Sequence, residues 1–166
     1  MISLKIKNTK AFMNHMLLQN TFDQFWVKEA SIETFYTMAI NGNRRKDFYT
    51  PEELEDESFQ TELIAWSECK NICLDMMKGK KTPLSFHFVL KLSKKNTEKT
   101  ICAADTTLTL LDVSGLYLNI SFENGSVTVI TGTSLNTFTM DKSLDHAWDE
   151  MVKKFLIKNN LDYDLA

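Results

Sequence analysis

The sequence predicts a single α+β domain, with a mainly antiparallel sheet and three to four helices. Large apolar residues occupy every second position over residues 84–92, and the positions between them are Ser85, His87, Val89 and Lys91, a pattern typical of a strand with one buried face. Over residues 144–155 the apolar residues instead recur every three or four positions, which indicates an amphipathic helix. The chain has 166 residues, and its five Gly and two Pro leave little sequence for linkers, so we expect residues 1–166 to form one domain.

The N-terminal segment combines a short strand with a helix. Ile2, Leu4 and Ile6 alternate with polar residues, which predicts a half-buried strand. Asn8 then suits the N-cap of a helix, because its side-chain oxygen can accept a hydrogen bond from the first turn. The apolar residues on one face of this helix are Phe12, Met13, Met16 and Leu17.

The next segment has the pattern of a β-hairpin. Residues 25–40 are rich in β-branched and aromatic residues, which fits one long strand or two short ones. Asn41-Gly42 is typical of a hairpin turn, because a type I′ turn needs positive φ at both central positions. We therefore expect a return strand that runs to about Tyr49.

Two helix starts follow the hairpin. Thr50, Pro51 and Glu53 have the pattern of a capping box with proline at the first helical position, so we expect a short acidic helix there. A second helix follows Trp66 and stops at Gly79, a residue that favours the end of a helix.

The second helix brings two cysteines onto one face. Its apolar face is formed by Cys69, Ile72, Cys73 and Met76. A zinc site would need a second Cys pair or paired His residues at short spacing, and neither accompanies these cysteines. We interpret Cys69 and Cys73 as core residues, and we expect no metal and no other cofactor.

The second half of the chain is predicted to hold most of the sheet. After the strand at 84–92, residues 94–104 fit either a helical turn or a loop. Further strands are expected at about 115–122, 126–131 and 135–140. Asn124-Gly125 forms the turn between the first two of these. The final helix spans Ser143 to Lys158, with Trp148 at the centre of its apolar stripe and buried against the sheet.

Composition and charge narrow the class of protein. The net charge of −3 and the pI of about 5.6 give no overall attraction to nucleic acid or to anionic membranes. The three Cys cannot form a disulfide framework, the first residues lack a secretory signal, and no apolar run is long enough to span a membrane. We expect a cytoplasmic protein with no membrane contact, and nucleic acid is not an expected partner.

The first candidate site is a basic turn formed by Lys78, Lys80 and Lys81 around Gly79. Lysines in an irregular segment can hold a phosphate as point charges. However, the turn follows a helix C-terminus, where the helix dipole repels anions and favours lysine side chains as caps. It also lacks the glycine spacing of a P-loop. The sequence is compatible with both interpretations, anion binding and helix capping.

The second candidate site is Arg44, Arg45 and Lys46. Acidic residues follow closely in the sequence, namely Glu52, Glu53, Glu55, Asp56 and Glu57. The two runs fit either solvated surface segments that partly neutralise each other or a bipolar docking surface for a protein partner.

The third candidate is a row of acids on the final helix. Asp141, Asp145 and Asp149 recur every four residues near His146, an arrangement that suggests a metal or acid–base site. The helix dipole offers a simpler explanation, because acids occupy the first turns and lysines the last. On that interpretation Asp149 to Lys153 and Glu150 to Lys154 are stabilising pairs.

Other polar residues give weaker indications. His15 and His87 have no nearby Ser or Cys that the sequence would nominate as a nucleophile. Residues 131–134 (Thr-Gly-Thr-Ser) fit either hydroxyl groups that contact a ligand or a tight turn between strands. No catalytic residue is assigned.

One predicted strand lacks protection against pairing with other chains. Residues 135–140 carry no charge and no Pro, whereas Lys91 protects another strand. If residues 135–140 form an edge strand, we expect it to be covered internally or to pair with a second copy or an extended peptide.

Several segments together resemble a known family. These are residues 78–84 (KGKKTPL), 115–120 (GLYLNI), 131–134 (TGTS), and 141–144 (DKSL) leading to Trp148-Asp149. Over nearly its full length the chain resembles an uncharacterised family of bacterial proteins, a domain of unknown function. That resemblance implies no activity, ligand or catalytic residue.

The order of elements is also similar to one domain of the bacterial DNA sliding clamp. Clamp domains consist of two β-α-β-β-β units, so this resemblance implies helices on one side of the sheets. The chain departs from the clamp pattern by its acidic insert at 52–57, its extra C-terminal helix and the absence of a strongly basic helix face. A shared fold would not by itself imply DNA binding.

Two classes of function follow from the sequence. The first is a non-enzymatic cytoplasmic binding or assembly module, with a protein partner or self-association through an edge strand. The alternative is an enzyme or a phosphate- or nucleotide-binding protein that uses the turn of Lys78, Lys80 and Lys81, together with His87. A pocket with convergent polar groups favours the alternative, and a flat apolar patch favours the first class.

Overall fold

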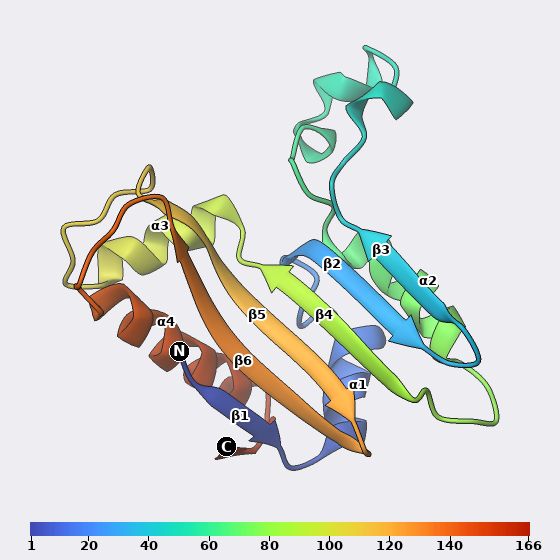
Figure 1. Ribbon diagram of the computed structural model, residues 1–166. Coiled ribbons are helices and arrows are strands. Elements are labelled where there is room, and N and C mark those ends of the chain that lie inside the picture. Colours follow the sequence, from blue (N-terminus) through green and yellow to red (C-terminus); the bar gives the residue numbers. More distant parts are fainter.

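All seven strands belong to one antiparallel sheet, and the computed structural model describes all 166 residues (Figure 1). The strands are β1 (Ser3–Ile6), β2 (Trp26–Glu33), β3 (Thr37–Asn41), β4 (Ser85–Lys91), β5 (Val113–Glu123), β6 (Ser126–Leu135) and β7 (Tyr163–Leu165). Their order across the sheet is β3-β2-β4-β5-β6-β1-β7, so β3 and β7 are the edges. The fold is therefore α+β, as predicted.

The four α-helices cover one face of the sheet (Figure 1). They are α1 (Thr9–Leu17), α2 (Trp66–Met77), α3 (Lys94–Ala103) and α4 (Ser143–Lys158). Three 3-10 turns lie between β3 and α2: η1 (Lys46–Phe48), η2 (Glu53–Glu55) and η3 (Glu57–Phe59). No helix has both the length and the apolar character that crossing a membrane would require.

The core lies between the sheet and the helices. Trp66 of α2 and Trp148 of α4 are both fully buried in it. Each indole N–H donates to a backbone carbonyl, from Trp66 to Met16 at 2.7 Å and from Trp148 to Tyr117 at 3.1 Å. The N–H of a buried Trp usually has a hydrogen-bond partner, and both rings follow this rule. The prediction that Trp148 packs against the sheet is confirmed.

Several predicted helix boundaries are also confirmed. The side chain of Asn8 accepts a hydrogen bond from the Ala11 amide at 2.9 Å and so caps α1. Helix α2 ends before Gly79, which has a φ of +152° that other residues rarely adopt. The ambiguous segment at 94–104 is a helix, capped by Ser93.

The predicted hairpin turn at Asn41-Gly42 is wrong. The turn between β2 and β3 lies at residues 34–36, and Asn41 is the last residue of β3. Gly42 is needed for a different reason, because a Cβ atom there would lie 1.7 Å from the Val27 carbonyl oxygen. The glycine thus allows two backbone segments to approach closely, and no return strand runs to Tyr49.

The predicted strand at 135–140 is also wrong. Strand β6 ends at Leu135, which pairs with Val113, the first residue of β5. The amide of Asn136 still donates to the Asp112 carbonyl at 2.8 Å, but residues 136–140 belong to no strand. The side chains of Phe138 and Met140 are exposed in an irregular segment. Lys91 does not protect an edge either, because β4 lies inside the sheet.

The clamp-like arrangement is not confirmed. Helix α3 separates β4 from β5, and all the strands form one sheet, so the order of elements does not contain two successive β-α-β-β-β units. The predicted acidic helix after Thr50 is reduced to the turn η2. Its capping box does form, with Thr50 and Glu53 exchanging hydrogen bonds of 2.8 and 3.2 Å.

Candidate functional site

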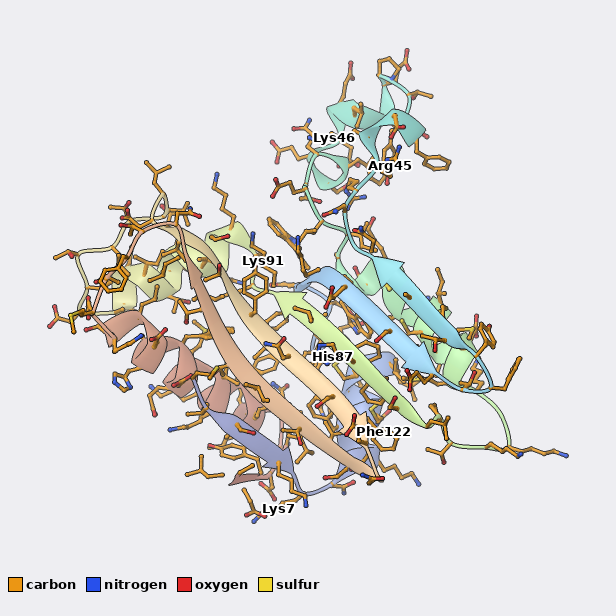
Figure 2. All side chains as sticks on the ribbon, viewed as in Figure 1. Lys7, Arg45, Lys46, His87, Lys91 and Phe122 are labelled. Carbon is orange, nitrogen blue, oxygen red and sulfur yellow. The ribbon has the colours of Figure 1, made fainter.

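The face of the sheet opposite the helices is lined by polar side chains. One row of paired residues crosses all seven strands. From edge to edge it consists of Ala39, Ser31, His87, Ser121, Thr128, Lys5 and Asp164. The neighbouring register positions, such as Phe86 and Phe122, point into the core. Figure 2 shows His87 near the middle of this open face.

A projecting segment stands at one end of the open face. It comprises residues 43–63, which we call the arm, and it extends beyond the ends of β2 and β3 in Figure 1. An isolated bridge between Asn43 and Leu63 closes its base. The rings of Tyr49 and Phe59 stack within it at 4.8 Å. The arm therefore has an anchored base and a small aromatic core of its own.

Arg44 holds the arm against α2. Its guanidinium donates to both carboxylate oxygens of Glu68, to the Tyr49 hydroxyl and to Thr61. The same group lies over the rings of Tyr49 and Phe59, about 6 Å from their centroids. All these contacts lie within the fold, so Arg44 has a structural role.

The arm and the open face enclose a concave site at their junction, which we call the corner site. Its volume is 310 Å³. Three lysines from separate parts of the chain line it: Lys28 from β2, Lys46 from the arm and Lys91 from β4. The remaining lining residues are Asn43, Arg44, Glu62, Leu63 and Tyr117. Figure 2 shows Lys91 at the end of β4 nearest the arm, which carries Lys46.

Local irregularities in the strands position these lysines. The pairing of β2 with β4 shifts between Val27 and Glu29, so Lys28 lies in a bulge with its side chain exposed. On β5, Gly115 leaves the space that the side chain of Lys91 occupies. A Cβ atom at Gly115 would lie 2.8 Å from the Lys91 Cε atom and 2.9 Å from the Tyr117 ring. Both irregularities direct lysines toward the corner site.

The charges of the corner site are unbalanced. None of its three lysines forms an ion pair or a hydrogen bond, whereas Lys7, Lys70 and Lys153 are each paired with a carboxylate. Glu68 neutralises Arg44, which leaves Glu62 as the one acid facing the three free ammonium groups. The site is thus locally positive in a chain whose net charge is −3.

The basic turn lies at the opposite end of β2 from the corner site. Lys78, Lys80 and Lys81 line a shallow depression together with the β2–β3 turn. Lys78 forms an exposed ion pair with Asp75 at 3.2 Å, and its amide caps the Leu74 carbonyl. Lys80 and Lys81 are exposed and have no partner. The capping interpretation therefore fits Lys78, and the other two lysines are free.

The three residues of the second candidate site, Arg44, Arg45 and Lys46, do not act together in the structure. Arg44 is buried in the base of the arm, and Arg45 forms an exposed pair with Asp47 at 3.0 Å. Arg44 and Lys46 both line the corner site, but Arg44 is paired with Glu68, so Lys46 is the one free charge that this cluster contributes to it.

The row of acids at and just before α4 forms hydrogen bonds and ion pairs within the fold, and Asp141 lies outside the helix. Asp141 accepts hydrogen bonds from the Ser143 amide and the Thr106 hydroxyl, Asp145 pairs with Lys142, and Glu150 pairs with Lys153. Hydrogen bonds from Ser143 and Thr106 hold the pKa of Asp141 below its usual value. The pairs differ from the predicted ones, because Asp149 is buried and Glu150 pairs with Lys153 instead of Lys154.

The buried Asp149 is bound from two sides. It accepts a hydrogen bond from the Thr131 hydroxyl at 2.5 Å and pairs with the N-terminal amine at 3.0 Å. Thr131, the first residue of the Thr-Gly-Thr-Ser segment, is therefore part of the core rather than a turn or a ligand contact.

Cys69 and Cys73 lie in the core, with their sulfur atoms 3.7 Å apart. The hydrogen bond to Cys69 and burial together raise the pKa of the Cys73 thiol. No group of three or more His, Cys, Asp or Glu side chains is arranged to hold a metal ion.

Sequence reasoning missed most of the corner site. Lys28, Lys91, Asn43 and Tyr117 come from separate segments, and each occurs in an ordinary local pattern. The alternation over residues 84–92 does place Lys91 on the polar face of its strand. Nothing in the sequence shows that Lys28 and Lys46 lie beside it.

Comparison with protein families gives a match over most of the chain. A family of unknown function, DUF5721, matches residues 15–164 of the chain. No curated protein and no solved structure matches it.

Proposed function

The chain belongs to DUF5721, a family of unknown function, and we propose that it is a binding module that holds a phosphate-bearing ligand in the corner site. The observation that carries this proposal is the convergence of Lys28, Lys46 and Lys91 on one concave site without a paired carboxylate. Ammonium groups that line one concave site attract an anion, because each makes a favourable Coulomb interaction with it. Lysine is well suited to this role, because it contacts phosphate oxygens as a compact point charge.

The size and the neutral groups of the corner site support the same proposal. Its 310 Å³ is at the lower end of the ~300–1,000 Å³ typical of small-molecule sites. The amide of Asn43 and the phenol of Tyr117 line the site without any hydrogen bond to other side chains. Both can donate to phosphate oxygens between the lysines. These groups favour a small phosphorylated ligand.

The chemistry of the lining residues favours binding over catalysis. General acid–base catalysis works best with a group whose pKa lies near the working pH, most often His. The corner site is lined by lysines, Arg44, Asn43, Tyr117, Leu63 and Glu62, with no His or Cys. Such groups hold and orient an anion, and none is paired with a base that would activate it as a nucleophile.

The experiment measures binding of inorganic triphosphate by isothermal titration calorimetry. The triple variant Lys28→Gln/Lys46→Gln/Lys91→Gln removes the three charges of the corner site. A matched control, Lys78→Gln/Lys80→Gln/Lys81→Gln, removes the same number of charges from the basic turn at the other end of β2. We expect at least about tenfold weaker binding in the first variant and near wild-type affinity in the control.

Three other outcomes would contradict the proposal. Loss of binding in the control alone would assign the anion to the basic turn, the alternative that the sequence suggested. Equal losses in both variants would indicate non-specific attraction, which also weakens steeply as salt rises to about 0.15 M. If the wild-type protein did not bind triphosphate at all, the phosphate-binding proposal would be wrong.

A further inference from the structure

A second cavity lies on the helix side of the sheet, away from the corner site. Its volume is 410 Å³, within the ~300–1,000 Å³ range of small-molecule sites. It opens between α3, α4 and the loop that connects α1 to β2. The lining residues are Asn20, Thr21, Gln24, Phe25, Leu92, Asn96, Lys99, Trp148, Met151, Val152 and Phe155. We call it the helix-side pocket.

The inner wall of the helix-side pocket is apolar. Phe25 and Phe155 meet edge to face with their ring centroids 5.8 Å apart, and both line the pocket. Trp148 contributes its ring to the wall, but its N–H is already bound to the Tyr117 carbonyl. The ring therefore offers the pocket only apolar surface. Met151 adds an adaptable side chain that can follow the outline of a ligand.

The mouth of the pocket carries polar groups that the fold does not use. The side chains of Gln24, Asn96 and Lys99 line the pocket and form no hydrogen bond or ion pair. Lys99 is the one charged residue among the lining residues. A single uncommitted ammonium group beside two free amides matches a ligand with one negative charge at one end.

The loop at the mouth is held in place by its own contacts. Lys70 of α2 forms an ion pair with Asp23 at 2.7 Å and donates to the Gln19 carbonyl at 2.9 Å. The hydroxyl of Thr21 and the His15 ring nitrogen are hydrogen-bonded at 2.7 Å. A preformed pocket loses less conformational entropy when a ligand binds. The structure of the mouth thus suits a ligand that enters without remodelling the loop.

We propose that the helix-side pocket binds a small amphipathic carboxylate. The apolar body of the ligand packs against Phe25, Trp148 and Phe155, and its carboxylate lies at the mouth, where Lys99 supplies the charge. The amides of Asn96 and Gln24 donate to the same carboxylate. This site is independent of the corner site, because the sheet separates the two.

The test compares three probes that share one hydrocarbon tail: octanoate, octan-1-ol and octylamine. Isothermal titration calorimetry should rank octanoate first and octylamine last. In Lys99→Gln we expect octanoate to bind about tenfold more weakly, at the level of the alcohol. Lys95→Gln is the matched control, because Lys95 lies one turn earlier on the exposed surface of α3 and does not line the pocket. It should bind octanoate like the wild type.

A blocking variant tests the location. Gln24 is an exposed loop residue at the mouth, so Gln24→Trp should obstruct entry while circular dichroism shows an unchanged fold. We expect it to weaken all probes that bind the wild type. The triple lysine variant of the corner site should bind octanoate normally, which keeps this proposal separable from the phosphate site.

The proposal fails if none of the probes binds the wild-type protein. It also fails if acid and alcohol bind equally and Lys99→Gln changes neither, because the carboxylate would then have no role. Equal losses in Lys99→Gln and Lys95→Gln would point to general surface charge. Unchanged binding in Gln24→Trp would place the ligand elsewhere.

Discussion

The guanidinium of Arg44 binds the carboxylate of Glu68 at two points, with an Nη1–Oε1 distance of 3.0 Å and an Nη2–Oε2 distance of 2.8 Å. The side chain of Arg44 is 2% exposed and that of Glu68 is 37% exposed. Glu68 also accepts the Ala65 amide at 2.7 Å, at the start of α2. One carboxylate therefore joins the base of the arm to the first turn of a core helix.

Loss of this pair should release the arm. In Arg44→Met we expect the free energy of unfolding to fall by about 1–3 kcal/mol, because charged hydrogen bonds to Glu68 and contacts with Tyr49 are lost. Urea denaturation measures the loss, and limited proteolysis should show new cleavage within residues 43–63. The control is Arg45→Met, where an exposed pair with Asp47 is removed and the change should stay within about 0.5 kcal/mol. Equal effects of the two substitutions would show that Arg44 does not anchor the arm.

The carboxylate of Glu68 should make the free energy of unfolding depend on pH. Burial opposes the ionisation of Glu68, but hydrogen bonds from Arg44 and the Ala65 amide outweigh it, and its pKa lies below the ordinary 4.5. A lowered folded-state pKa stabilises the fold fully above about pH 4.5, and this contribution is lost as the pH falls through the lowered value. Glu68→Gln cannot titrate, so the stability difference between wild type and variant should shrink as the pH falls below about 4.5. A difference that stays constant from neutral to acidic pH would contradict this.

The final helix offers a test of core packing. Trp148→Ala should lower the free energy of unfolding by about 3–5 kcal/mol, because a fully buried indole is replaced by a cavity. Ile157→Ala on the same helix is the control, since Ile157 is 61% exposed and should cost about 0.5 kcal/mol or less. Chemical denaturation measures both. A loss below about 1 kcal/mol for Trp148→Ala would mean that α4 does not dock on the sheet through this ring.

Two glycines should respond differently to the same added methyl group. Gly42→Ala places a Cβ atom 1.7 Å from the Val27 carbonyl oxygen, so the backbone must move and we expect a loss of roughly 1–3 kcal/mol or more. At Gly132 the nearest atom would be 3.5 Å away, an ordinary contact, and the fold should tolerate alanine. Thermal denaturation compares the two variants. Equal melting temperatures would show that β2 and the start of the arm are not in close contact.

The parts of the fold that the sequence predicted correctly are those with a local physical cause. The alternation over residues 84–92 and the stripe on α4 follow from burial of one face, so they can be read without knowledge of the partner. Helix α3 was ambiguous because it buries Thr97 and Thr100 alongside Ile101, which weakens the apolar pattern. Strand β7 has only three residues, too few to show alternation.

The errors have a different cause. Asn41-Gly42 has the composition of a tight turn. The glycine is required for another reason, because the backbone of Val27, far from it along the chain, lies too close for a Cβ atom. The corner site was missed for the same reason, since Lys28, Lys46 and Lys91 meet only after the sheet and the arm have formed. Contacts between segments distant in sequence leave no local pattern.

The place of β1 within the sheet has a consequence for how the chain folds. Strand β1 is the first along the chain, but Ser3 pairs with Ile130 of β6 and Leu4 pairs with Leu165 of β7. These pairings close very long loops, whose entropic cost must be met before the contacts form, and high contact order of this kind slows folding. During synthesis β1 has no neighbour until β6 (Ser126–Leu135) has emerged, and its second neighbour, β7, is the last element of the described chain. Strands β2, β3 and β4 pair with partners closer in sequence, so they can assemble first. Strand β1, although first in the chain, then joins the sheet last.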